Sequence, residues 1–138
     1  MRGRLFAIIL AVLWSGSLWA QEALPPNPKI QDVIEGQVEA FLADDFGTAF
    51  TFAGPSIQRM FRDPETFGSM VRNGYPMVHR PSDLMFGELR EISGLLWQKV
   101  IVVDGAGQTH VLDYRMGEYE DGWRIDAVQI LPTPGVSA

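Results

Sequence analysis

Hydrophobic and polar residues alternate along the last third of the chain, from Leu95 to Leu131, in the pattern of an antiparallel meander. The segment reads LLWQKVIVVD, then the loop GAGQ, then THVLDYRMGEYE and, after a DG pair, WRIDAVQIL. Asp121-Gly122 between two alternating segments is a strong hairpin signal, because a type I′ turn needs positive φ at both central residues. The pattern therefore predicts three successive strands joined by tight connections.

A two-residue loop at Asp121-Gly122 fixes which side chains share a face. It places Glu120 opposite Trp123 and Tyr114 opposite Gln129. One face of the hairpin is then mainly apolar and is expected to be covered: Leu112, Tyr114, Met116, Trp123, Ile125, Ala127 and Leu131. The other face carries most of the charge and is expected to meet water: Asp113, Arg115, Arg124 and Asp126.

The residues before the meander have helical spacing. Apolar residues recur every three or four positions from Ile30 to Leu42, and Asn27-Pro28 is typical of a helix start. Two short helical pieces broken at Gly54-Pro55 follow, and Asp63-Pro64 begins another helix. Leu84 to Ile92 is predicted to be a fourth strand. This order predicts an α+β fold, with N-terminal helices packed on a curved antiparallel sheet of about four strands.

The first twenty residues resemble a secretory signal peptide. Arg2 and Arg4 precede a short apolar core, Leu5 to Trp14, and the segment ends on Ala20. We therefore predict a signal peptide over residues 1–20, a linker over 21–27, a single domain over 28–131 and a tail over 132–138. An uncleaved anchor is the alternative, although the core is short for a membrane span. A cleaved signal predicts a periplasmic or secreted bacterial protein with no membrane span.

Charge and composition exclude several kinds of partner and cofactor. Loss of Arg2 and Arg4 leaves 9 basic against 17 acidic residues, a net charge of −8. Such a field repels phosphate backbones, so nucleic acid is not an expected partner. The chain has no Cys, which removes disulfides, thiol nucleophiles and thiolate metal ligands.

Three stretches together resemble a known family. They are IQDVIEGQVEAFLADDFGTAFTFAGPSIQRMF, DPETFGSMVRNGYPMV and YEDGWRIDAVQIL. They are similar to exported bacterial proteins grouped as a domain of unknown function, number 4864, over roughly residues 28–131. The architecture also looks like the nuclear-transport-factor-2-like, or cystatin-like, cone. The family name implies no activity, and members of the superfamily range from isomerases to binding modules, so the fold does not choose a function.

Tyr114, Gln129 and His110 form the most notable polar set, because all three are expected to point towards the helices. Ketosteroid isomerase, a relative by architecture, uses an Asp base and a Tyr in such a pocket. Here Asp113 and Asp126 are expected to point outwards, which leaves His110 as the base of a small lyase or isomerase. The simpler interpretation is a core Tyr–Gln hydrogen bond with His110 partly in water.

No metal or cofactor is expected. Asp44-Asp45 follows the first helix and is more typical of a helix end and a cap for the next helix than of a metal site. The two histidines, His79 and His110, are too far apart in sequence for a common zinc motif.

The aromatic residues favour a binding role. A cone-shaped fold leaves a mouth between helices and sheet that can bind an apolar small molecule. The candidate pocket residues are Phe41, Trp97, His110, Tyr114, Trp123 and Gln129. We therefore predict a non-enzymatic small-ligand-binding or interaction module. The alternatives are a lyase or isomerase that uses Tyr114 and His110, and a structural partner of an envelope protein. A homodimer through the sheet is also compatible with the pattern.

Overall fold

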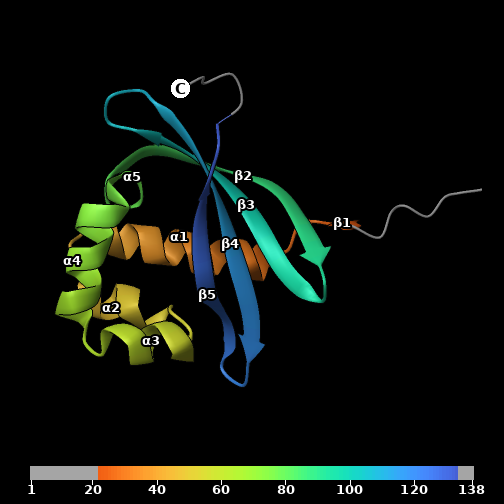
Figure 1. Cartoon of the computed structure of the whole chain (residues 1–138), viewed down its shortest axis with the longest axis horizontal. Helices are drawn as coiled ribbons and strands as arrows, with labels where there is room; N and C mark the ends of the chain where they lie inside the picture. The colour runs from red at the N-terminus through yellow and green to blue at the C-terminus, as the bar shows by residue number, and fades with distance from the viewer. Residues whose placement is uncertain (1–21, 134–138) are drawn as a thin grey trace, which may run out of the picture.

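The computed structural model describes residues 22–133, so the predicted signal peptide and the last five residues of the predicted tail lie outside the described residues. The elements are β1 (Glu22–Leu24), α1 (Pro28–Leu42), α2 (Phe46–Thr51), α3 (Pro55–Phe61), α4 (Pro64–Gly74), α5 (Pro76–His79), β2 (Pro81–Ile92), β3 (Leu95–Asp104), β4 (Thr109–Tyr119) and β5 (Gly122–Leu131). The strands form one antiparallel sheet in the order β1-β2-β3-β4-β5 (Figure 1). The predicted α+β class is confirmed. The sheet has five strands because β1 forms within the predicted linker and pairs with β2.

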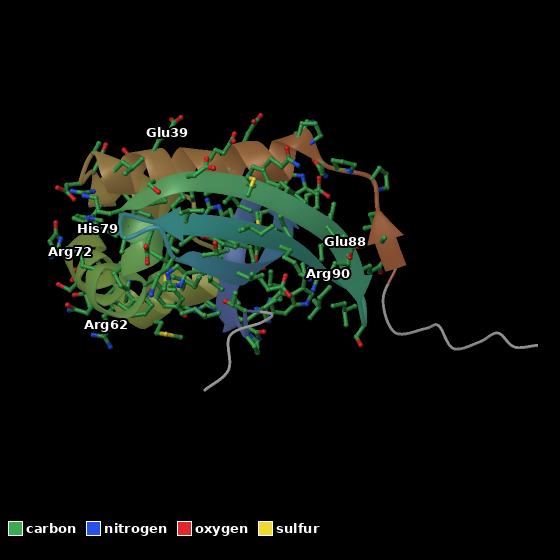
Figure 2. The ribbon with its side chains drawn as sticks, turned by 90° about the horizontal axis from the view of Figure 1, so that it is seen from above. Glu39, Arg62, Arg72, His79, Glu88 and Arg90 are labelled. Atoms are coloured by element: carbon green, nitrogen blue, oxygen red, sulfur yellow. The ribbon has the colours of Figure 1, made fainter. Side chains whose placement is uncertain are left out.

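The helices cover one face of the sheet. α1 runs along that face, and α2 to α5 gather beside it at one end (Figure 1). Viewed from above, α1 and the sheet are two layers, with Arg90 at the end near β1 and His79 and Arg72 at the opposite end near α4 (Figure 2). The buried stripe of α1 has the expected three- and four-residue spacing and consists of Ile30, Ile34, Gln37, Val38, Ala40 and Phe41.

Proline and short polar caps set the helix starts. α1, α3, α4 and α5 each have Pro at the first helical position, where the missing N–H is not needed. The Asn27 side chain accepts from the backbone N–H of Lys29 and Ile30, and Asp63 accepts from that of Thr66. At the other end of α1, Arg80 donates to the carbonyl oxygen of Phe41 at 2.8 Å. The helix starts therefore follow from local chemistry, whereas the end of α1 is held by Arg80 from a distant segment.

The β4–β5 hairpin differs from its prediction at the turn. Tyr119 faces Gly122, so the tight connection is Glu120-Asp121 and not Asp121-Gly122. Positive φ falls on Gly122 and not on Asp121, so the predicted type I′ turn is wrong. Glu118 now faces Trp123, a shift of two residues that leaves side-chain parity unchanged near the turn.

A bulge then changes parity in the second half of β5. Met116 faces Ile125 but Arg115 faces Ala127, which leaves Asp126 as an extra residue. Tyr114 therefore faces Val128 and not Gln129. Asp126 fits because Gly54 and Gly117 leave room for its carboxylate, where a Cβ at either position would collide with it. The shifted turn and this bulge together make the predicted Tyr114–Gln129 pair wrong.

The outer face of the sheet is less exposed to solvent than predicted. Asp113 is only 5% exposed and forms a two-point ion pair with Arg90, with Nη–Oδ distances of 2.8 and 2.7 Å. Its prediction as a solvent-facing residue is wrong, because β2 brings Arg90 across the sheet to meet it. On the same face, one row of apolar residues crosses four strands: Met85, Ile101, Val111 and Leu131.

Candidate functional site

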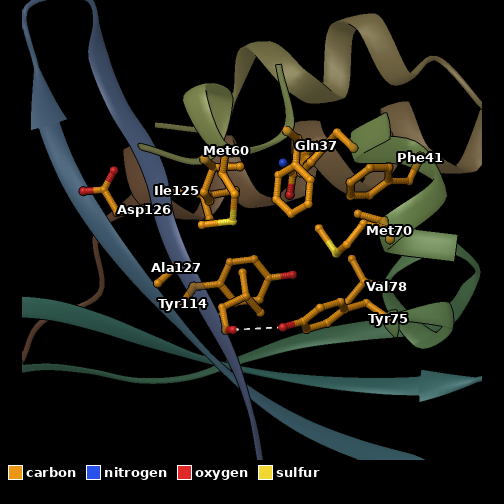
Figure 3. Close-up of a pocket in the computed structure, with 15 residues that line it drawn as sticks. Gln37, Phe41, Met60, Met70, Tyr75, Val78, Tyr114, Ile125, Asp126 and Ala127 are labelled. Atoms are coloured by element: carbon orange, nitrogen blue, oxygen red, sulfur yellow. Dashed lines mark hydrogen bonds between the residues drawn. The ribbon is translucent and has the colours of Figure 1, made fainter. Parts of the chain in front are cut away.

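A cavity of about 280 Å³ lies between the helices and the β4–β5 hairpin. Its walls come from α1, α3, α4, α5 and the two strands (Figure 3). Eleven of the lining residues are apolar: Phe41, Ile57, Met60, Phe61, Phe67, Met70, Val71, Val78, Ile125, Ala127 and Val128. The other four are Gln37, Tyr75, Tyr114 and Asp126. The cavity is thus an apolar chamber with a few polar groups, the usual composition of a small-molecule site.

Phe67 of α4 organises the helical wall. Its ring lies 5.9 Å from the ring of Phe41, 5.9 Å from that of Phe61 and 5.2 Å from that of Phe50, between centroids. Met70 and Val71 follow at the three- and four-residue spacing of one helix face and also line the cavity. One aromatic cluster therefore joins α1, α2, α3 and α4 on one side of the chamber.

The Tyr114 hydroxyl is one of two buried side-chain polar atoms that lack a hydrogen-bond partner within residues 22–133; the other, Gln98 Oε1, belongs to a residue that does not line the cavity. Tyr114 is 1% exposed. Figure 3 shows that the hydroxyl points into the pocket. Burial, with a smaller contribution from nearby Tyr75, raises the pKa of Tyr114 far above its usual value, so the hydroxyl stays neutral. An unpaired buried hydroxyl destabilises the fold by about 1–3 kcal/mol, so its presence needs an explanation.

Two other polar groups of the lining are already engaged. Tyr75 donates its hydroxyl hydrogen to the carbonyl oxygen of Val128 at 3.2 Å, and this bond holds α4–α5 against β5 (Figure 3). Gln37 donates from Nε2 to the carbonyl oxygen of Ala49 at 3.1 Å, which joins α1 to α2. Both contacts support the walls of the cavity.

Asp126 lies at the edge of the cavity with its carboxylate occupied. The Tyr119 hydroxyl donates to both oxygens, at 2.8 and 3.0 Å. This hydrogen bond raises the pKa of Tyr119. In Figure 3 the carboxylate turns away from the Tyr114 hydroxyl. Asp126 therefore does not direct its carboxylate at the Tyr114 hydroxyl. Asp113 does not either, because it lies on the opposite face of β4.

The structure brings together two of the six predicted pocket residues. Phe41 and Tyr114 line the cavity. Gln129 is exposed and faces Asp113 on the outer face, because of the bulge in β5. Trp97 faces Arg90 on the outer side, since its position alternates with buried Gln98.

The other two predicted residues lie elsewhere on the molecule. His110 has its Nε2 2.8 Å from Oδ2 of Asp104, and neither residue lines the cavity. This contact is the largest cause that lowers the pKa of Asp104. Trp123 lines a separate surface hollow with Lys29 and Phe52. Both were placed by alternation alone, which gives the face of a strand but not the position of a cavity along it.

Among the lining residues that sequence reasoning did not select are Gln37, Tyr75, Met60 and Met70. Gln37 carried a signal as a polar residue within the apolar stripe of α1, and Met70 carried one through its helical spacing from Phe67. Tyr75 meets Val128 across 53 positions of sequence, and no local pattern indicates that contact.

The paired acids after α1 have structural roles. Asp45 caps α2 by accepting from the backbone N–H of Thr48. Asp44 contacts His79 and Arg80, at 2.8 and 2.9 Å. The hydrogen bond from His79, ahead of those from Arg80, lowers the pKa of Asp44. Within the described residues, no three His, Asp or Glu side chains converge as a metal site would require.

Fold and site together define an α+β protein in which helices and an antiparallel sheet enclose a small apolar cavity. The chain belongs to the family described as Domain of unknown function (DUF4864), whose model matches residues 23–138. No curated protein matches the chain, and no solved structure does. None of the helices described between residues 22 and 133 has the length and apolarity needed to cross a membrane.

Proposed function

We propose that this protein is a binding module for a small, mainly apolar molecule that enters the cavity beside Tyr114. The supporting observation is the Tyr114 hydroxyl, which is buried, faces the cavity and has no partner among the described residues. Buried polar groups in packed cores are nearly always hydrogen-bonded, and ligand pockets carry a few polar groups that fix the orientation of the ligand.

A binding role fits the surroundings of Tyr114 better than catalysis does. A lyase or isomerase that uses Tyr114 needs a base near the reacting atom. His110 is held by Asp104 away from the cavity, and the carboxylate of Asp126 is engaged by Tyr119. The proposal therefore assigns Tyr114 to recognition and not to proton transfer.

The proposal also covers the cellular location and the architecture of the protein. The N-terminal pattern of Arg2, Arg4 and an apolar core supports export to the periplasm or beyond it. The arrangement of helices over a curved sheet supports the nuclear-transport-factor-2-like cone as its architecture. An envelope protein as partner, and a homodimer through the outer face of the sheet, stay predictions.

The test uses naphthalene, a neutral molecule of ten carbon atoms, as a probe of the cavity. We expect saturable binding to the wild-type protein, seen as shifts of the Met60 and Met70 methyl signals in NMR spectra. Val128→Phe places a larger side chain in the cavity and should abolish these shifts. Val111→Phe makes the same change on the opposite face of the hairpin and should leave them unchanged.

Two outcomes would contradict the proposal. One is the absence of saturable shifts in the wild-type protein up to the solubility limit of naphthalene. The other is equal binding by wild type and by a folded Val128→Phe variant, which would place the probe outside the cavity. Native mass spectrometry of the protein as isolated gives an independent check, because a retained ligand adds mass that is absent from Val128→Phe.

A further inference from the structure

We infer that the cavity selects an uncharged molecule of roughly a dozen non-hydrogen atoms that presents one hydrogen-bond acceptor, a carbonyl oxygen, to the Tyr114 hydroxyl. This inference rests on the proposed binding function and adds the chemical class of the ligand. It follows from the charge, hydrogen bonding and size of the cavity.

The charge of the lining excludes ions from the interior. No Lys, Arg or His is among the residues that line the cavity, so a carboxylate or phosphate would be buried without a counter-ion. The one acid, Asp126, directs its carboxylate to Tyr119 and between Gly54 and Gly117. A cation would therefore find no free carboxylate in the chamber. A neutral ligand meets neither penalty.

Hydrogen bonding indicates the group that the ligand carries. Of the four polar lining residues, Tyr75, Gln37 and Asp126 already bond to other described residues. The Tyr114 hydroxyl bonds to none of them, and it remains protonated because burial raises its pKa. A protonated phenol is a good donor, so the complementary group is an acceptor such as a carbonyl oxygen.

The cavity volume limits the size of the ligand. An engineered apolar cavity of about 150 Å³ accommodates benzene, which has six carbon atoms. At the same ratio, the 280 Å³ of this cavity corresponds to roughly ten to twelve non-hydrogen atoms. A bicyclic ketone or a medium-length acyl compound has this size.

α3 provides the route of entry. It is the one helix of six residues or more in the described chain that has no buried residue, although three of its side chains line the cavity. Met60, on this helix, is 70% exposed and also lines the cavity, so it lies at the mouth. The unbranched Met side chain adapts to ligands of different shape. On this route the ligand enters with its polar end leading, towards the buried Tyr114 hydroxyl.

The test compares three probes of similar size in the wild-type protein and in Tyr114→Phe. Tetralin is a bicyclic hydrocarbon, α-tetralone is the same ring system with a carbonyl group, and 2-naphthoate is an anion. Wild type should bind α-tetralone about five- to tenfold more tightly than tetralin, the value of one hydrogen bond. Tyr114→Phe should remove this difference and leave the affinity for tetralin unchanged. 2-Naphthoate should bind neither protein.

The outcomes separate the two proposals. If no probe binds the wild-type protein, the binding function itself fails. If tetralin and α-tetralone bind equally to the wild-type protein, or if the preference for α-tetralone survives in Tyr114→Phe, the binding function stands and the carbonyl assignment is wrong. Binding of 2-naphthoate as tight as that of α-tetralone would overturn the exclusion of anions. Val111→Phe, on the opposite face of the hairpin, serves as the control, because it leaves the cavity lining unchanged and should leave the preference intact.

Discussion

Asp113 and Tyr114 are neighbours on β4, and both bury a polar group, but the fold treats the two groups in opposite ways. The Asp113 carboxylate faces outwards and meets the Arg90 guanidinium through two hydrogen bonds. The Tyr114 hydroxyl faces inwards and meets no described residue. Both side chains are almost fully shielded, with 5% and 1% exposure, so burial does not explain the contrast.

The proposed binding function accounts for this difference between the two polar groups. A buried carboxylate requires a partner in every state of the folded protein, since an isolated buried charge is strongly unfavourable. A buried neutral hydroxyl without a partner costs less free energy, so the folded protein tolerates it in the absence of a ligand. Variants of Asp113 therefore test stability, whereas variants of Tyr114 test the proposed binding function.

The largest expected effect is the loss of the outer pair. Asp113→Ala leaves the Arg90 guanidinium buried without its carboxylate and should lower the free energy of unfolding by about 3–5 kcal/mol. Denaturant unfolding measures this change. The double variant Arg90→Met with Asp113→Leu should recover most of the stability, because two apolar side chains need no counter-charge. A loss below about 1 kcal/mol in Asp113→Ala, within the range of an exposed pair, would show that the pair is not structural.

Gln98 gives an intermediate case on the inner face, where it faces Tyr114. It is fully buried, and its Nε2 donates to the carbonyl oxygens of Gly87 and Lys99, at 3.0 and 2.9 Å. Gly87 lies at the irregularity in β2, where the ladder of hydrogen bonds is interrupted. Gln98→Met should lower the free energy of unfolding by about 1–2 kcal/mol, because these carbonyl oxygens lose a donor. Chemical denaturation that shows no loss would mean that water or the backbone replaces the amide.

Tyr114→Phe should change stability least among the buried positions, and in the opposite direction. Removal of an unpaired hydroxyl leaves the free energy of unfolding unchanged or raises it by up to about 1 kcal/mol. Tyr75→Phe is the matched comparison: it loses the bond to Val128 and should destabilise by about 0.5–1.5 kcal/mol. Thermal unfolding of both variants without ligand measures the two effects. A clear loss of stability in Tyr114→Phe would mean that the hydroxyl has a partner in the free protein.

Sequence patterns predicted the face of Tyr114 but not its neighbours. Period-two alternation places Tyr114 inwards whatever the exact register, because a shift of two residues preserves parity. The bulge at Asp126 reverses parity for the rest of β5, and it depends on space left by Gly54, a residue about seventy positions away. Hence Val128, and not Gln129, faces Tyr114.

Contacts between distant segments account for the other differences. The Arg90–Asp113 pair joins strands that are separated by a third, β3, so alternation within β4 could only predict a charged face. The helix starts were easier, since the Asn27-Pro28 and Asp63-Pro64 signals act within one turn. Local chemistry therefore predicted the fold class and most of the elements, but not β1 or α5, and the cavity required the assembled layers.

The smallest expected effect comes from an exposed carboxylate, which completes the contrast with Asp113. Asp63 accepts a hydrogen bond from the backbone N–H of Thr66, and this bond is the largest cause that lowers the pKa of Asp63. Because the folded pKa lies below the unfolded value of about 3.9, its contribution is present above that pH and is lost as the pH falls through the folded pKa. Asp63→Asn keeps a good cap without the titration. The variant should match wild type at pH 7 and lose less thermal stability between about pH 4 and pH 2. An equal loss of melting temperature in wild type and Asp63→Asn across that interval would show that solvent screens this cap completely. The Asp113 pair, in contrast, should keep its effect on stability in high salt because it is buried.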